Sequence, residues 1–159
     1  MVLTTISNGY KVLIGEVTAK FGSIDSVHQT PHSGTDYSCK MFTEIHAPFS
    51  GVVSRIADYG NHTGLGKSVF VRVGDKQYVI GHLSSIKTHV GQIIHKGDLL
   101  ALSGNTGNST APHMHFGAFN ALGKVIDPCL LNNGHQIPFS SFHAEVADTL
   151  LSLITSIPI

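Results

Sequence analysis

The sequence predicts a mainly β fold, an antiparallel β-sandwich, and three observations lead to it. Short runs of β-branched or apolar residues recur along the chain, and glycine, asparagine and aspartate bound them. The chain holds 17 glycines in 159 residues, enough for the many tight turns of such a fold. A composition of 42% hydrophobic and 13% charged residues suits a compact, weakly charged domain with a substantial core.

We expect a strand wherever such a run occurs. Residues 51–56 continue from a glycine through Val-Val-Ser-Arg-Ile, and residues 68–73 contain Val-Phe-Val-Arg-Val. Residues 77–80 (Gln-Tyr-Val-Ile) and 99–102 (Leu-Leu-Ala-Leu) are shorter runs of the same kind. A last strand is expected around His113 and His115, because a segment rich in glycine and asparagine precedes this pair and Phe116, Ala118 and Phe119 continue the run.

The C-terminal part has a different pattern. A turn at residues 132–134 (Asn-Asn-Gly) separates a domain of residues 1–131 from an extension of residues 132–159. Residues 142–154 space their apolar side chains as a short amphipathic helix does, and this helix is too short to span a bilayer. We expect it to pack on the sandwich or on a second copy of the chain, which would produce self-association; docking to a membrane surface or a partner is the alternative.

Two histidines, His113 and His115, are separated by a single residue. In a strand, positions two apart share one face, whereas a helix would send them to nearly opposite sides. Neutral imidazole is the commonest nitrogen ligand of zinc, so the pair points to a metal centre. Taken alone, the same pattern also fits two solvated or core-bonded imidazoles.

An upstream segment supplies further ligands. His32 and Asp36 stand four residues apart, and we expect the flexible Gly34 between them to let both side chains converge on one ion. Together with one histidine of the later pair they make three ligands, which leaves a coordination position for water and the other histidine as a base. His82, at the end of an apolar run, is one more imidazole that could reach the same cleft.

Four motifs in this order resemble those of the lysostaphin and LytM type of zinc endopeptidases, which cut peptides of bacterial peptidoglycan. The motifs are H-x-x-x-D at residues 32–36, G-H-L at 81–83, G-N-T-G-x-S-T at 104–110 and P-H-x-H-F at 112–116. The similarity extends from about Val17 to Leu131. It implies an antiparallel β-sandwich of the LytM and lysostaphin catalytic-domain type, Zn²⁺ as the cofactor and peptidoglycan peptides as the substrate.

The resemblance also implies a role for each site residue. His32, Asp36 and His115 would hold the zinc, while His113 and His82 would assist catalysis without binding it. Zinc polarises the scissile carbonyl and lowers the pKa of water, and an adjacent neutral imidazole then accepts the proton as the hydroxide attacks. The second imidazole would stabilise the oxyanion or pass a proton to the leaving amine. We favour His113 as the base, and the remaining division of roles stays open.

Of the departures from the family pattern near these residues, Ala111 and Met114 are packing changes, and two others bear on catalysis. Gly117 follows the H-x-H-F motif where many members carry glutamate, which puts an orienting hydrogen bond from that position in doubt. No tyrosine lies between Phe21 and His32, so the tyrosine that helps bind the oxyanion in some members has no evident counterpart. Both departures would affect the catalytic rate and the substrate specificity, and neither removes a zinc ligand.

Two other functions share part of this pattern. A non-catalytic relative, acting as a structural or activator module, typically loses a ligand or the base, whereas all five positions are filled here. A zinc D,D-carboxypeptidase acting on the same stem peptides would carry a longer His-to-Asp spacing and an E-x-x-H motif, and Thr110 and Pro112 stand where its glutamate would be. The sequence therefore predicts a zinc-dependent endopeptidase that cuts the stem peptide or the cross-bridge of peptidoglycan.

The charge balance of the sequence bears on which binding partners to expect. Ten basic and ten acidic residues give zero formal charge with no lysine or arginine cluster, so we expect no nucleic-acid partner. Cys39 and Cys129, the only cysteines, match no metal-binding spacing, and we expect two buried thiols, with a disulfide between them as the alternative.

The expected place of action is the bacterial cell wall. The first ten residues show no basic segment followed by an apolar one, so no secretion signal is predicted. A wall-cutting enzyme without such a signal would be delivered by a phage, as a lysin or a virion component, or would be a domain excised from a larger secreted protein.

Overall fold

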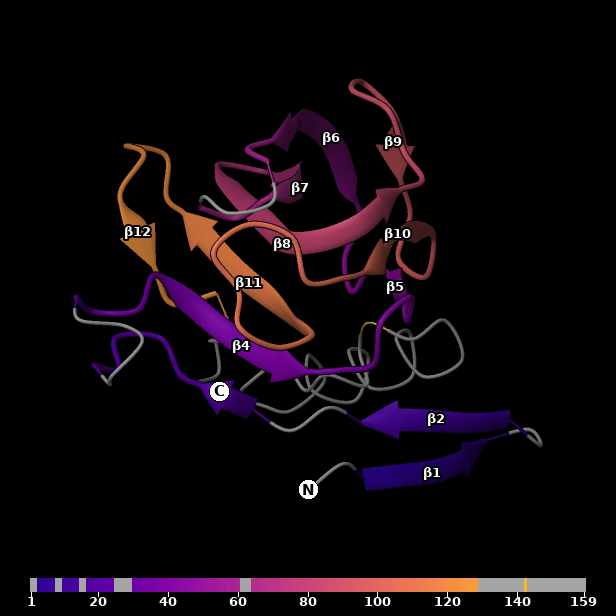
Figure 1. Ribbon diagram of the computed structural model, residues 1–159. Coiled ribbons are helices and arrows are strands. Elements are labelled where there is room, and N and C mark those ends of the chain that lie inside the picture. Colours follow the sequence, from indigo (N-terminus) through magenta and orange to yellow (C-terminus); the bar gives the residue numbers. More distant parts are fainter. Residues whose placement is uncertain are drawn as a thin grey trace, which may run out of the picture.

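The structure is a computed structural model that describes residues 3–7, 10–14, 17–24, 30–60, 64–128 and 142. The described residues form twelve strands (Figure 1). In chain order they are β1 (Leu3–Ser7), β2 (Tyr10–Ile14), β3 (Val17–Ala19), β4 (Gly34–Ser38), β5 (Glu44–His46), β6 (Gly51–Asp58), β7 (Lys67–Val73), β8 (Lys76–Ile86), β9 (Ile93–Ile94), β10 (Leu99–Ser103), β11 (His113–Phe119) and β12 (Val125–Ile126).

The strand pairings of the described residues are all antiparallel, as the sequence predicts. β1 and β2 form a separate hairpin, and the other ten strands join in one sheet whose main path is β3-β4-β11-β8-β7-β6-β9. β10 pairs with β5 and β8, and β12 pairs with β11. Figure 1 shows the long, curved strand β8 at the centre, between β11 and β7. This arrangement places β4 and β11, which are far apart in sequence, side by side.

Each of the five predicted strands is present as β6, β7, β8, β10 or β11. The largest difference concerns β8, which runs on through His82 to Ile86, although the apolar pattern predicts an end near residue 80. Pairing with β10, which matches Ala101 to Ile86 and Leu102 to Ser85, holds this polar continuation in the sheet. Tertiary hydrogen bonding therefore extends a strand that local hydrophobicity does not mark.

The core lies on one face of β4 and β11, and the site lies on the other. Met114 and Phe116 are completely buried, while His113 and His115 alternate with them along β11. On β4, Tyr37 is 1% exposed in the core and is the direct neighbour of Asp36. Any change in core packing beneath these strands is thus transmitted to the polar side chains above them.

Phe142 is the one described residue of the C-terminal extension, and it is completely buried. Its ring centroid lies 5.1 Å from that of Phe116 and 6.0 Å from that of Tyr37, so it packs directly beneath β11 and β4. The rest of the predicted helix lies outside the described residues, and the domain boundary and self-association through this helix stay predictions. No helix among the described residues is long and apolar enough to cross a membrane.

Phe142→Ala is expected to lower the free energy of unfolding by about 3–5 kcal/mol, because it empties a fully buried aromatic position. Chemical denaturation measures the change. Phe42→Ala is the matched control: the same atoms are removed from a side chain that is 65% exposed, so a change within about 0.5 kcal/mol is expected. Equal stability of the two variants would show that Phe142 does not belong to the core in solution.

Cys39 is half-buried and forms no disulfide with any other residue that the structure describes. Burial raises the pKa of this thiol, and a hydrogen bond with Ser103 opposes the shift only in part. A thiol of raised pKa is a poor nucleophile and a poor metal ligand, which agrees with the structural role predicted for it. Cys129 lies outside the described residues, so the alternative of a disulfide stays untested.

Candidate active site

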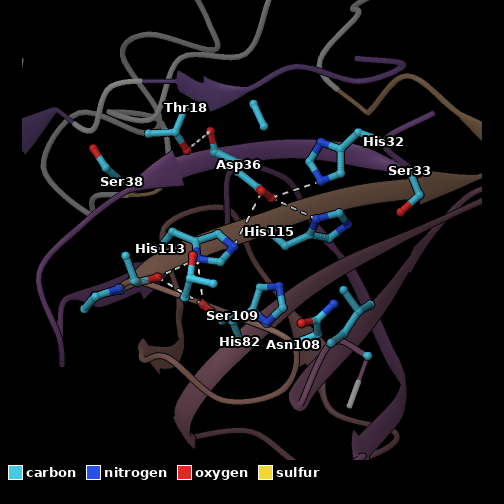
Figure 2. A pocket seen from close by; sticks show the side chains of 16 residues that line it. Thr18, His32, Ser33, Asp36, Ser38, His82, Asn108, Ser109, His113 and His115 are labelled. Atoms are coloured by element: carbon cyan, nitrogen blue, oxygen red, sulfur yellow. Dashed lines mark hydrogen bonds and ion pairs between the residues drawn. The ribbon is translucent and has the colours of Figure 1, made fainter. Parts of the chain in front are cut away.

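The pairing of β4 with β11 brings the two sequence motifs together. Asp36 lies directly opposite His115 in the register of this strand pair. His32, just before β4, is held in place by backbone hydrogen bonds with residues 22 and 23. Figure 2 shows these side chains pointing into one cavity together with His113 and His82. All five residues that the sequence singles out for the site are therefore neighbours.

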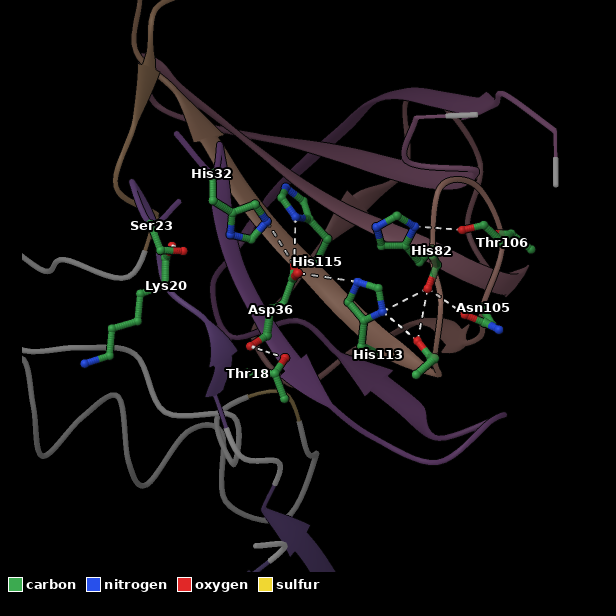
Figure 3. A network of polar contacts seen from close by, with 12 residues as sticks. Thr18, Lys20, Ser23, His32, Asp36, His82, Asn105, Thr106, His113 and His115 are labelled. Atoms are coloured by element: carbon green, nitrogen blue, oxygen red, sulfur yellow. Dashed lines mark hydrogen bonds and ion pairs between the residues drawn. The ribbon is translucent and has the colours of Figure 1, made fainter. Parts of the chain in front are cut away.

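Asp36 is the centre of this group and contacts three histidines (Figure 3), which are divided between its two carboxylate oxygens. Oδ1 lies 2.9 Å from Nδ1 of His115 and 3.3 Å from Nε2 of His32. Oδ2 lies 3.5 Å from Nε2 of His113. Asp36, His32 and His115 are each buried, with 4%, 6% and 3% of their surface exposed. The contacts thus separate His113 from the other two histidines, as the resemblance implies.

The donor set fits a zinc ion. One atom each from His32, Asp36 and His115 lie within 4.8 Å of one another. Ligands at about 2.0–2.1 Å around a tetrahedral zinc are about 3.3 Å apart, close to the separations from Asp36 Oδ1 to the two ring nitrogens. Two imidazoles and a carboxylate are a known ligand type for zinc, and three protein ligands leave one position open.

Burial and polar contacts determine the charge of Asp36, His115 and His82 at neutral pH. Burial by itself would raise the pKa of Asp36, but hydrogen bonds with His115 and His32 outweigh it and hold that pKa well below its usual range. Burial lowers the pKa of His115, against the influence of Asp36. Burial and the nearby His113 lower the pKa of His82 to about 4. At neutral pH Asp36 is therefore ionised and both of these rings are neutral, the states required of metal ligands and proton acceptors.

Two glycines make room for the ring of His115. Gly34 and Gly117 pair across β4 and β11. A Cβ added at Gly34 would lie 2.7 Å from Nε2 of His115 and would also collide with the carbonyl oxygen of Phe116. A Cβ at Gly117 would lie 3.2 Å from the same nitrogen. The prediction that Gly34 serves through flexibility is wrong: it lies within a strand, and its lack of a side chain is what the site needs.

His82 reaches the cavity because β8 is irregular at this point. Its φ of +61° is rare for a residue with a side chain, and the pairing of β8 with β7 changes register nearby. Its ring lies 4.4 Å, centroid to centroid, from the ring of His113. Such a backbone conformation costs of order 1–3 kcal/mol, and the role of His82 in catalysis stays a prediction that this strain favours.

The cavity has a volume of about 390 Å³, and part of its wall comes from segments that no motif marks. Thr18 and Ala19 of β3 line one side, and Gly64 and Leu65 before β7 line another. These residues carry no recognisable chemistry of their own, because their place is set by strand pairing. Sequence patterns could not have identified them.

Comparisons with known proteins agree with this geometry. The sequence profile of Peptidase family M23 matches residues 30–128. An uncharacterised metalloprotease of Haemophilus influenzae is 40% identical over 99 residues, which are 62% of this chain and 20% of that protein. The peptidoglycan DD-endopeptidase ShyA of Vibrio cholerae is 36% identical over 89 residues, 54% of this chain and 20% of that protein.

A solved structure resembles this one as well. The catalytic domain of the antimicrobial peptidase lysostaphin from Staphylococcus simulans superposes with a TM-score of 0.59 at 25% identity, covering 77% of this chain and 87% of that chain. The predicted lysostaphin-type fold is thereby confirmed. The chain spans about one fifth of the length of the two curated relatives.

Proposed function

The chain belongs to peptidase family M23, and on that premise we propose that it is a zinc-dependent endopeptidase that hydrolyses peptide bonds of bacterial peptidoglycan. One observation carries the proposal: a buried His-Asp-His cluster of zinc-binding geometry lies in an open cavity with two further histidines beside it. The names of the relatives, which include peptidoglycan DD-endopeptidase and lysostaphin, support this substrate class.

In this proposal His32, Asp36 and His115 hold the metal. Zinc, when bound there, polarises the scissile carbonyl and makes water more acidic. Asp36 does most to organise the group, because its Oδ1 faces both ligand histidines and its low pKa keeps it charged. Gly34 and Gly117 leave the space that the ring of His115 occupies, because a Cβ at either position would crowd its Nε2.

His113 is the proposed general base. Its Nε2 lies 3.5 Å from Oδ2 of Asp36, so the carboxylate would stabilise the imidazolium that forms when His113 accepts a proton from the attacking water. His82 is less suited to hold a proton, since its pKa is lowered to about 4. We assign it the orienting role: as a neutral ring it accepts a hydrogen bond from the water or the substrate within the cavity.

A digestion experiment tests the function. Purified peptidoglycan of several wall types is incubated with the protein, and the new termini are identified by mass spectrometry. We expect internal peptide bonds to be cut, hydrolysis to stop with a chelator and to return when zinc is added, and about one zinc per chain by elemental analysis.

The other outcomes of the digestion are informative. Release of only the terminal D-alanine would identify the D,D-carboxypeptidase alternative. No cleavage of any wall type by the zinc-loaded protein would favour the non-catalytic relative. Cleavage that is indifferent to chelation, in a protein without zinc, would refute the metal assignment.

We place this activity at the bacterial cell wall, where the substrate is found. Delivery by a phage, as a lysin or a virion component, stays a prediction, as does excision from a larger secreted protein. Immunodetection of the protein in purified virions and in lysates of infected cells, compared with the culture medium of uninfected cells, distinguishes the two routes.

A further inference from the structure

A second cavity, of about 550 Å³, lies at the end of the sheet where β7 turns into β8 and β11 turns into β12 (Figure 1). The chain contains two arginines, Arg55 of β6 and Arg72 of β7, and both line this cavity. Lys76 adds a third cation, and Asp75 is the one acid among the described lining residues. The cavity therefore has an excess of positive charge, which suits an anion.

The strand register places this cavity on the face of the sheet that carries the proposed zinc ligands. On β11, His115, Gly117 and Phe119 share one face, because they are two residues apart. Phe119 pairs with Gln77 of β8, and Gln77 pairs with Arg72 of β7. Directly paired residues project to the same face of a sheet. Phe119, Gln77 and Arg72 thus form one row across three strands, on the face of His115.

The two cavities are separate but lie within the reach of one peptide. Phe119 follows His115 by four residues along β11, which at about 3.3 Å per residue separates their two rows by roughly 13 Å. Val79 and Phe70, paired in the row between them, are buried. An extended peptide of about four residues spans the same distance. A polymeric substrate bound at the zinc site is therefore long enough to contact the second cavity as well.

Arg55 is oriented by its neighbours. Its Nη2 donates a hydrogen bond to the hydroxyl of Tyr59 at 2.6 Å. Its guanidinium carbon lies 5.0 Å from the ring centroid of Phe70 and 5.8 Å from that of Tyr59, so both rings attract the cation. The hydrogen bond to Tyr59 uses one of the five N–H donors of a guanidinium group. The other donors can serve an anion.

Arg72 lies diagonally across from Arg55. Val52 pairs with Arg72, and Arg55 pairs with Phe70. Diagonal neighbours are about 7–8 Å apart, within reach of long side chains. Within the part of the chain that the structure describes, no carboxylate forms an ion pair with either arginine. Two neighbouring guanidinium groups repel each other, and an anion bound between them removes this repulsion.

We propose that Arg55 and Arg72 form a subsite for a carboxylate of the peptidoglycan peptides. The inference rests on the proposed function, which supplies the peptide substrate. Guanidinium groups suit carboxylates because two parallel N–H···O bonds match the two oxygens. A polymer of phosphates fits less well, since Asp75 in the lining would repel closely spaced negative charges.

Binding without cleavage is the first measurement. Zinc-loaded protein that carries His113→Ala, so that cleavage is slow, is sedimented with insoluble peptidoglycan to give a Kd. In this background Arg72→Gln and Arg55→Gln should each raise Kd by about 10-fold, the scale of one hydrogen bond to a charged group. Lys87→Gln is the control, because it removes the same charge from an exposed residue outside the cavity, and Kd should not change.

Chemical treatment of the peptidoglycan identifies the ligand. Amidation of its carboxylates with a carbodiimide and ammonia should raise the Kd of the protein with both arginines about 10-fold, to the value of Arg72→Gln. The same treatment should leave the Kd of Arg72→Gln unchanged. Removal of phosphate polymers with hydrofluoric acid should change neither Kd.

Kinetics with His113 intact are the second measurement. Because the subsite lies roughly 13 Å from the zinc ligands, it should bind the substrate equally in the ground state and the transition state. Arg72→Gln should therefore raise KM by about 10-fold and leave kcat and zinc content unchanged.

The results separate the subsite from the activity. Equal Kd values for Arg72→Gln and the protein with both arginines, or an equal rise of Kd in Lys87→Gln, would overturn the proposal. So would a difference that disappears with the phosphate polymers, which would identify those polymers as the ligand. Cleavage with an unchanged KM in Arg72→Gln would reject the subsite and leave the endopeptidase activity intact. Binding that needs both Arg72 and the carboxylates, in a protein that cuts no peptidoglycan, would uphold the subsite and reject the activity.

Discussion

His115→Ala is expected to lose zinc and hydrolytic activity together. The substitution removes a buried nitrogen that lies 2.9 Å from Oδ1 of Asp36, at the point where the proposed ligands meet. His32 and Asp36 alone supply two ligands, one fewer than a catalytic zinc site needs. Elemental analysis of the gel-filtered variant gives zinc per chain, and the same sample is assayed on peptidoglycan. A folded variant that retains one zinc would refute this ligand assignment.

His113→Ala is the matched comparison, since it removes the same side chain from the same face of β11. We expect this variant to keep zinc and fold while turnover falls by roughly 100-fold or more, the scale for losing a positioned general base. The reason is geometric: His113 contacts Oδ2 of Asp36, not the oxygen shared by the ligands. His82→Ala should likewise keep zinc and lose rate. Loss of zinc from His113→Ala with retention in His115→Ala would reverse the two roles.

Gly34→Ala is expected to weaken zinc binding by about 10- to 100-fold, although no proposed ligand is touched. The new Cβ would lie 2.7 Å from Nε2 of His115 and would collide with the backbone oxygen of Phe116, so β4 and β11 must move apart. This movement separates Asp36 from His115, the pair that the register brings together. Overpacking should also cost about 1–3 kcal/mol of folding free energy.

Gly117→Ala controls for adding a methyl group to the same strand pair. Its Cβ would meet Val79 at 3.1 Å and Nε2 of His115 at 3.2 Å, side-chain atoms that can yield by a few tenths of an ångström. We expect a smaller loss of zinc affinity than in Gly34→Ala, measured by competition with a chromophoric chelator. Equal affinity in both variants and the unmodified protein would show that the glycine pair does not shape the metal site.

The chemistry of the site could be predicted from the sequence because it depends on side-chain type and short spacing. His113 and His115 share a face for any strand, and His32 and Asp36 supply the nitrogen and oxygen donors that zinc accepts. Strand positions were predictable for a similar reason: apolar alternation reports which face of a strand is buried. The last part of β8 is polar and lacks this alternation, so the predicted strand ended too early.

The arrangement of the histidines around Asp36 could be seen only in the tertiary structure, because it depends on pairing between distant strands. Only the register of β4 with β11 places one oxygen of Asp36 between His32 and His115 and the other beside His113. Only the tertiary structure brings the turn residues Thr106 and Ser109 into contact with His82 and His113.

The sequence by itself thus determined the strand pattern, the antiparallel class and the five polar residues of the site, since each of these follows from residue type and local periodicity. The tertiary structure alone decided that Gly34 acts through its small size, that Phe142 completes the core, and that Arg55 and Arg72 line one cavity. These contacts join residues far apart in the chain or depend on the exact path of a loop. Local sequence carries no information on such distances, because they are set by the packing of the whole sheet.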